Sequence, residues 1–234
     1  MWRTINHEFV HISLSPEKLT CSWIAREPKK KSFVLKAFKS MRFEHREYEQ
    51  SILFSPMRIG NWISAFLSMY NLQHALVTIS IAGPHIVESI VDLPIASPKP
   101  TDFPFLKLQS LLWDYRYLYT KDNSRSAFYL CGIPQHILFQ YKLLAIQASL
   151  NIITITTHRM ALFYLYHYTK GPTFRASQLA QDMQMHNNQL DSYFSSDMLH
   201  RIVSVSPAVS TDFTQHSAHL AAAIGLFTQG VTNS

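Results

Sequence analysis

Residues 126–168 constrain the fold of this chain more than any other segment. An apolar run over 127–131 ends at Gly132-Ile133-Pro134, and apolar residues then recur on one helical face: Ile137, Leu138, Tyr141, Leu144, Ala145 and Ala148. A β-branched run over 152–155 follows, and a second helical pattern covers 160–168. Short apolar runs between breakers are typical of buried strands, and i, i+3, i+4, i+7 spacing is typical of helices. This order predicts a parallel α/β unit whose helices cover a sheet.

Composition excludes several classes of protein. Of the 234 residues, 47% are hydrophobic and 15% are charged, so the chain can bury a core and is not composed like a disordered protein. No stretch approaches the roughly 20 consecutive apolar residues of a membrane span. The first residues, MWRTINHEFVH, lack the apolar run of a secretion signal, and we therefore expect a cytoplasmic protein. Cys21 and Cys131 form no CxxC pair, which favours buried, reduced thiols.

The net charge of +6 is concentrated in the first part of the chain. Residues 1–60 carry eleven Lys or Arg against six Glu, whereas the remainder carries ten basic against nine acidic residues. A basic lobe can attract acidic proteins, phosphate backbones or anionic lipid. The simpler interpretation is a solvated hairpin tip at Lys29-Lys30-Lys31, and charge alone identifies no partner.

The same patterns predict the other elements. Ser55-Pro56 marks a helix start, with Ser at the N-cap and Pro in the first turn. Ser97-Pro98-Lys99-Pro100 marks a boundary between subdomains. Strands are expected over residues 9–14, 19–26, 32–39, 75–81, 85–93 and 108–119, and helices over residues 56–70 and 218–227, with order returning at 199–205. Three strands, a helix, further strands and the α/β unit are the layout of an RNase H-like fold, the half-domain of actin-like ATPases.

Several short motifs, in order, resemble PilM-type proteins, the actin-like cytoplasmic proteins of type IV pilus assembly. They are ALVTISIAGPHIVESIVDLP (75–94), Trp113-Asp114-Tyr115, CGIPQHILFQYKLLAIQASLNIITI (131–155) and Ala223-Ile224-Gly225-Leu226. The resemblance implies an α/β, actin-like/RNase H-like half-domain with a reduced inserted β subdomain. The boundaries that follow are 1–72 and 101–169 for the core lobe, 73–100 for the inserted subdomain, and 170–234 for a truncated second half with a C-terminal helix.

The first phosphate loop of that family, Asp-x-Gly-x-x-x-x-Lys, is degenerate in this chain. The matching positions hold His11, Ser13 and Lys18, and Pro16 removes a further backbone donor. Glycine lets backbone N–H groups close on the phosphates, and the Asp helps to organise magnesium. With only six glycines, the chain offers no replacement cradle. We therefore expect no ATP hydrolysis, no cofactor and no metal; residual ATP binding stays open as a weaker alternative.

Rival catalytic sites have weaker support. His7-Glu8-Phe9-Val10-His11 is a literal HExxH, but it lies on a predicted strand, where its histidines are not one helical turn apart. We interpret His136, His158 and His167 as ordinary core or surface histidines. Glu88, Asp92 and Asp114 lie on predicted strands without a converging partner, and a reactive Cys131 would need exposure at a helix N-terminus.

The resemblance implies a non-catalytic scaffold at the inner face of the inner membrane. PilM-type proteins bind the cytoplasmic tail of a bitopic membrane protein between the main lobe and the inserted subdomain. Such a groove would lie beside residues 75–94 and 113–119, with the basic lobe facing anionic lipid or the assembly motor. The alternative is a nucleic-acid-binding module, because Trp113, Tyr115, Tyr117 and Tyr119 alternate at period two. Packing of that row on one sheet face is the simpler interpretation.

Overall fold

A computed structural model describes the fold of residues 8–27, 32–43, 48–49, 52–53, 55–94, 102, 111–122, 125–170, 199, 202–207, 209 and 217–232. Its largest unit is a six-stranded sheet in the order β10-β6-β1-β2-β3-β11. The strands are β1 (Glu8–Leu14), β2 (Lys18–Glu27), β3 (Ser32–Arg42), β6 (Leu76–Ile81), β10 (Asn151–Thr157) and β11 (Val203–Val205). The antiparallel meander β1-β2-β3 lies beside the parallel strands β6 and β10, the expected RNase H-like layout.

Helices cover both faces of this sheet, and β1 is therefore buried along almost its whole length. On one face lie α1 (Pro56–Met69) and α2 (Gln135–Gln147), which contact Val10, Ile12 and Leu14 of β1 through one apolar cluster. On the other face lie α3 (His158–Lys170) and α7 (Ser217–Thr232), which pack against Phe9 in a second cluster. The period-two alternation of β1 thus divides its side chains between two cores.

The helix starts show how local sequence sets these elements. Pro56 occupies the first turn of α1, as predicted, but Ser55 contributes its carbonyl to Ile59 and no side-chain cap. Thr157 instead caps α3: its Oγ1 accepts a hydrogen bond from the Met160 backbone N–H at 3.2 Å. The predicted C-terminal helix is present as α7, and order at 199–205 includes β11, which pairs in parallel with β3.

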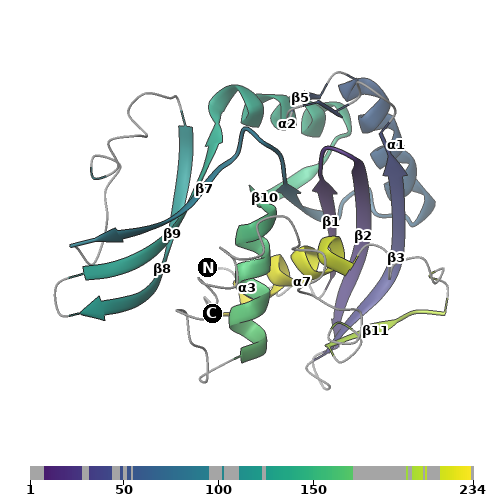
Figure 1. Cartoon of the computed structure of the whole chain (residues 1–234). Coiled ribbons are helices and arrows are strands. Elements are labelled where there is room, and N and C mark those ends of the chain that lie inside the picture. The colour runs from purple at the N-terminus through teal and green to yellow at the C-terminus, as the bar shows by residue number, and fades with distance from the viewer. Residues whose placement is uncertain are drawn as a thin grey trace.

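A second sheet stands apart from the first, with α3 between them (Figure 1). It has the order β7-β9-β8 and is antiparallel throughout: β7 (Val87–Leu93), β9 (Arg125–Pro134) and β8 (Leu111–Asp122). A further short pair, β4 (Tyr48–Glu49) with β5 (Ile52–Leu53), lies near α2. We call the β7-β9-β8 sheet the small sheet.

The small sheet corrects the predicted parallel unit. The strand, helix, strand and helix within 126–168 are all present, but β9 belongs to the small sheet and β10 to the large one. The strand also does not stop at Cys131, because β9 continues through Gly132-Ile133-Pro134 and α2 follows at once. Periodicity identified the element types; it carried no information on which sheet each strand joins.

The same topology places the subdomain boundaries differently from the prediction. Strand β6, assigned by sequence to the inserted subdomain 73–100, lies inside the six-stranded sheet. Strands β8 and β9, assigned to the core lobe 101–169, pair with β7 in the small sheet instead. The inserted unit therefore begins after β6 and extends to the end of β9. Most of 170–198 lies outside the described residues, so the predicted second half is represented by β11 and α7.

One glycine is required for the packing of α3 on α7. A Cβ built on Gly225 would lie 1.8 Å from the carbonyl oxygen of Ala161, a separation that no side chain tolerates. The two helices therefore cross with their backbones in contact, and the hydroxyl of Thr228 donates to the Tyr164 carbonyl at 3.3 Å beside this crossing.

Among the described residues, no helix combines the length and apolar composition needed to cross a bilayer.

Candidate functional site

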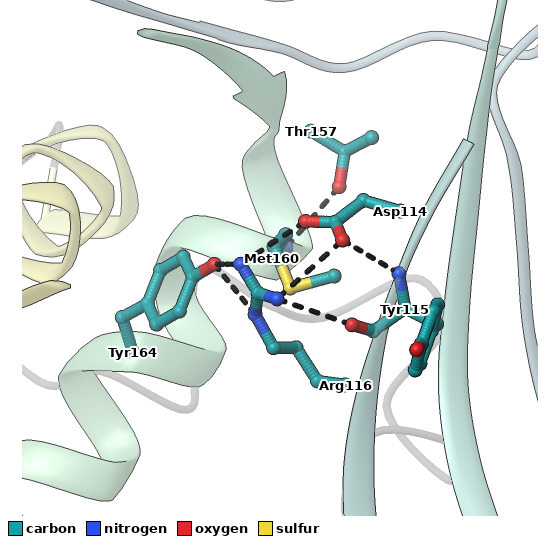
Figure 2. A network of polar contacts seen from close by, with 6 residues as sticks. All are labelled: Asp114, Tyr115, Arg116, Thr157, Met160 and Tyr164. Atoms are coloured by element: carbon teal, nitrogen blue, oxygen red, sulfur yellow. Dashed lines mark hydrogen bonds and ion pairs between the residues drawn. The ribbon is translucent and has the colours of Figure 1, made fainter. Parts of the chain in front are cut away.

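The small sheet is attached to the large one through α3. The guanidinium of Arg116 on β8 donates from Nε to the hydroxyl oxygen of Tyr164 on α3 at 2.8 Å, and its Nη2 contacts the same oxygen. Asp114 binds the same guanidinium: its Oδ2 lies 3.1 Å from Nη2, and its Oδ1 accepts from Nη1 at 3.4 Å. Figure 2 shows these side chains converging between β8 and α3, with Thr157 at the start of the helix. Strand β8 is thereby fixed to the helix that follows the edge strand β10.

A second set of contacts joins β7 and β9 to the start of α3. Glu88 accepts a hydrogen bond from the Tyr129 hydroxyl at 2.8 Å and lies 3.4 Å from the guanidinium of Arg159. Burial raises the pKa of Glu88, while hydrogen bonds from Thr157 and Tyr129 and the charge of Arg159 act in the opposite direction. These partners come from three separate elements, so no local pattern in the sequence identifies them as partners of Glu88.

A cavity of about 320 Å³ opens beside these contacts. It lies at the carboxyl ends of β6 and β10, the edge at which open α/β sheets commonly bind ligands. We call it the junction pocket; it is lined by Ile81, Ala82, Gly83, Ile86, Glu88, His158 and Arg159. Its wall is apolar at Ile81 and Ile86 and charged at Glu88 and Arg159. Such a pocket can accept an apolar side chain with a polar group beside it.

Beneath the pocket, a cluster of hydroxyl and imidazole groups fills the space between β1, β6 and the first turns of α3 and α7. Ser13 Oγ lies 2.7 Å from Nδ1 of His219 and 3.4 Å from Nδ1 of His158, and it accepts a hydrogen bond from Ser80 at 3.1 Å. His11 contacts Thr78 and Ser80 through its two ring nitrogens at 2.9 and 3.0 Å. Among the predicted candidates, His11, Ser13 and His158 are therefore brought together.

Burial makes His11 a neutral, structural group. Its side chain is almost fully buried, and desolvation, with a smaller contribution from His158, lowers its pKa to about 3. Glu8 and His11 lie in the strand β1, as the sequence predicted for the HExxH segment; His7 lies outside the described residues. Glu8 faces solvent, where it accepts from Trp23 and pairs with Lys36. The described part of the chain contains no group of three or more metal-binding side chains.

The predicted phosphate-loop positions His11 and Ser13 lie in β1 and Lys18 begins β2, with a tight turn between the strands. The backbone N–H and the hydroxyl of Ser15 both donate to the carbonyl of Lys18, at 3.0 and 3.2 Å, and this turn joins β1 to β2. The backbone donor of Ser15 is thereby used to close the turn, and Pro16 has none. Lys18 begins β2, while the Ser13 side chain lies inside the buried cluster. The three positions His11, Ser13 and Lys18 do not form a common cradle.

The remaining candidates do not line the pocket, although Cys131 pairs with Glu88 across the β7-β9 ladder. Cys131 is buried, and desolvation raises the pKa of its thiol to about 12, while burial likewise raises the pKa of Cys21. His136 is exposed at the start of α2, and the side chain of His167 lies outside the described residues. Asp92 lies on β7, where its carbonyl accepts from Arg125.

The aromatic row of β8 packs against its own sheet. Trp113 stacks on Tyr115 with ring centroids 5.5 Å apart, and Tyr115 and Tyr117 both meet the edge of Phe128 at 5.9 Å. The side chain of Tyr119 lies outside the described residues. The contacts favour packing on one sheet face for Trp113 and Tyr115, which are half-buried, whereas Tyr117 is 52% exposed.

This chain is similar to known proteins in three-dimensional structure but not in detectable sequence. The chain matches no family model and no curated protein sequence. Among solved structures it is similar to a chain of the PilM-PilN type IV pilus biogenesis complex, with 10% identity and a TM-score of 0.65. That superposition covers 97% of this chain and 99% of the other. It confirms the α/β fold class and the PilM-like resemblance predicted from the motifs.

Two further structures are similar to a lesser degree. One is the cytoplasmic domain of EpsL, an inner membrane component of the type II secretion system of Vibrio cholerae, with 10% identity over 66% of this chain and 58% of that one, at a TM-score of 0.41. The other is a Bacteroides thetaiotaomicron protein of actin-like ATPase fold and unknown function, with 14% identity over 70% and 56%, at 0.34.

Proposed function

We propose that this chain is a non-catalytic scaffold of a type IV pilus or secretion-type assembly, and that it binds the cytoplasmic tail of a bitopic inner-membrane protein at the junction pocket. The observation that carries the proposal is the pocket itself, which lies between the small sheet and the large sheet in a chain whose fold matches PilM over almost its full length. We infer a cytoplasmic protein at the periphery of the inner membrane.

The pocket is suited to anchor a peptide. Its apolar residues come from the β6 end and the turn into β7, within 75–94, one of the two segments beside which the resemblance implies a groove; residues 113–119, the other segment, do not line the pocket. At about 320 Å³ it has room for a few side chains, so the rest of a tail would lie along the surface outside it. Glu88 and Arg159 supply one acceptor and one donor group at its rim, which would fix the orientation of an extended segment.

The non-catalytic part of the proposal rests on the state of the degenerate loop. The Ser13 side chain fills the position at which the family has glycine, and its Oγ is engaged by His219 and Ser80. In the tight turn of residues 15–18 the backbone N–H of Ser15 donates to the Lys18 carbonyl, and Pro16 has no N–H to offer a phosphate. Phosphate binding at such loops depends on several converging backbone N–H groups. We therefore propose that the chain neither hydrolyses ATP nor needs a cofactor.

The charge distribution supports a further part of the scaffold role. Residues 1–60 carry a net charge of +5, counted as eleven basic minus six acidic residues. We propose that this lobe faces anionic lipid or the assembly motor ATPase while the junction pocket holds the tail. Electrostatic attraction of this kind is weakened by salt, whereas an apolar anchor in the pocket is much less sensitive.

Binding of labelled tail peptides tests the proposal. N-terminal cytoplasmic peptides of the bitopic inner-membrane proteins of the source cell are titrated with the full chain and followed by fluorescence anisotropy. Ala82→Leu narrows the pocket and should weaken the binding peptide at least about tenfold. Ala65→Leu, the same change at an exposed position of α1, should leave affinity unchanged. Equal affinities of both variants and the parent chain would contradict the assignment of the site.

A further inference from the structure

Helix α2 is apolar on two opposite faces. Ile137, Tyr141 and Leu144 are buried toward the large sheet, and they contribute to the core cluster shared with α1. The opposite face carries an exposed apolar stripe of three large side chains, with exposed fractions of 59% for Phe139, 45% for Leu143 and 75% for Ile146. Large exposed apolar side chains gathered in one row are unusual on a soluble surface and mark interaction sites. We call these three residues the α2 stripe.

The spacing of the α2 stripe indicates the shape of its partner. Phe139, Leu143 and Ile146 are separated by four and three residues, which is the a/d spacing of helices that pack side by side. A ridge of this kind fits the groove between side chains of another helix. The stripe points away from the large sheet and the junction pocket lies elsewhere, so the two surfaces can be occupied independently.

The charges beside the stripe indicate the composition of that helix. Lys142 is the one charged residue in the sequence of α2, and it lies beside the stripe with glutamines at positions 135, 140 and 147. A second copy of the chain would bring two lysines together, which is unfavourable, while acidic side chains on a partner helix would complement Lys142. We propose that the α2 stripe docks an amphipathic helix of a partner protein whose apolar face is flanked by Glu or Asp.

A designed helix tests this proposal on the full chain. The probe is a labelled three-heptad peptide with Leu at a and d and Glu at e and g; its counterpart carries Lys at e and g. We expect the Glu peptide to bind at least about tenfold more tightly than the Lys peptide, and to slow amide hydrogen exchange over residues 139–146. Ile146→Lys should abolish binding. Gln147→Lys adds the same charge one residue away and should leave binding equal or tighter.

Each other outcome overturns the proposal. If neither peptide binds, or both bind equally, the stripe does not select an acidic helix. If the chain dimerises in sedimentation and Ile146→Lys makes it monomeric, the occupant is a second copy. If it floats with phosphatidylglycerol vesicles and Ile146→Lys removes flotation, the occupant is a lipid surface. Because Ile146 and Gln147 are both exposed, Ile146→Lys and Gln147→Lys should leave the melting temperature unchanged. Loss of folding would then not explain loss of binding.

Discussion

The Nε of Arg116 on β8 donates to the hydroxyl oxygen of Tyr164 on α3 at 2.8 Å, a contact between residues 48 positions apart in sequence. Through this bond the small sheet is fixed to the helix that leads out of the large sheet. Asp114 holds the same guanidinium from the strand side. The relative position of the two walls of the junction pocket therefore depends on a charge-assisted hydrogen bond.

Tyr164→Phe should loosen this attachment. Removal of the hydroxyl leaves Arg116, which is half-buried, with one fewer acceptor, and we expect a loss of about 1–3 kcal/mol in unfolding free energy. Amide hydrogen exchange should rise in β8 and β9 more than in β1. Tyr115→Phe is the matched control, because Tyr115 lies on the opposite face of the same strand, and it should change neither measurement. Equal effects of the two substitutions would show that Tyr164 does not hold the small sheet.

Gly225→Ala should destabilise the packing of α3 on α7. The added Cβ would meet the Ala161 carbonyl at 1.8 Å, so the helices must move apart, at a cost of about 2–3 kcal/mol. Gly60 in α1 provides the control, since its Cβ would have ordinary contacts beginning at 3.5 Å. Because alanine favours helix, Gly60→Ala should be neutral or stabilising by up to about 1 kcal/mol. Thermal unfolding of both variants measures the difference.

The buried His11 predicts a dependence of stability on acid pH. Its pKa is lowered to about 3 in the folded chain from a reference value of 6.5, so the unfolded chain binds the proton first as pH falls. Its contribution is complete above pH 6.5 and is lost progressively between pH 6.5 and 3. His11→Gln keeps a hydrogen-bonding side chain without this titration. The unfolding free energy of the variant should therefore fall less steeply over that range, and parallel curves would contradict the assignment.

Mg-ATP should not stabilise the chain. A ligand that binds the folded state raises the melting temperature by mass action, so millimolar nucleotide is a sensitive probe of weak binding. We expect no shift, because Ser13 and the turn of residues 15–18 leave no phosphate cradle. His11→Asp combined with Ser13→Gly restores the family residues at two positions and serves as the comparison. A shift in the parent chain would contradict the absence of nucleotide binding.

The sequence predicted which segments are strands or helices better than it predicted which sheet each strand joins. The meander β1-β2-β3, helix α1 and the α2-β10-α3 segment follow from local periodicity, which depends on neighbours in the chain. The separation of β9 from β10 into different sheets does not, because a buried strand has the same apolar composition in either sheet. The contact between Ser13 and His219 joins residues 206 positions apart, and no local pattern encodes it.

The candidate site was predicted only in part, because local sequence patterns do not encode contacts between residues far apart in the chain. The segment 75–94 contains residues of the pocket wall, and the short motifs that resemble PilM indicated it. The prediction that Glu88 has no converging partner is wrong, because Arg159 and Tyr129 reach it from α3 and β9. One signal was available: an acidic residue within an apolar strand must be neutralised or paired when that strand is buried.

Site-specific photo-crosslinking in the source cell tests the central claim most directly. A photoreactive amino acid replaces Ile86 at the junction pocket or, as a control, Ala65 at an exposed position of α1. The crosslinked products are identified by mass spectrometry. The account predicts a crosslink from position 86, and none from position 65, to the cytoplasmic tail of a bitopic inner-membrane protein of a pilus or secretion assembly. A crosslink from position 86 to nucleic acid, or to no membrane protein, would contradict it.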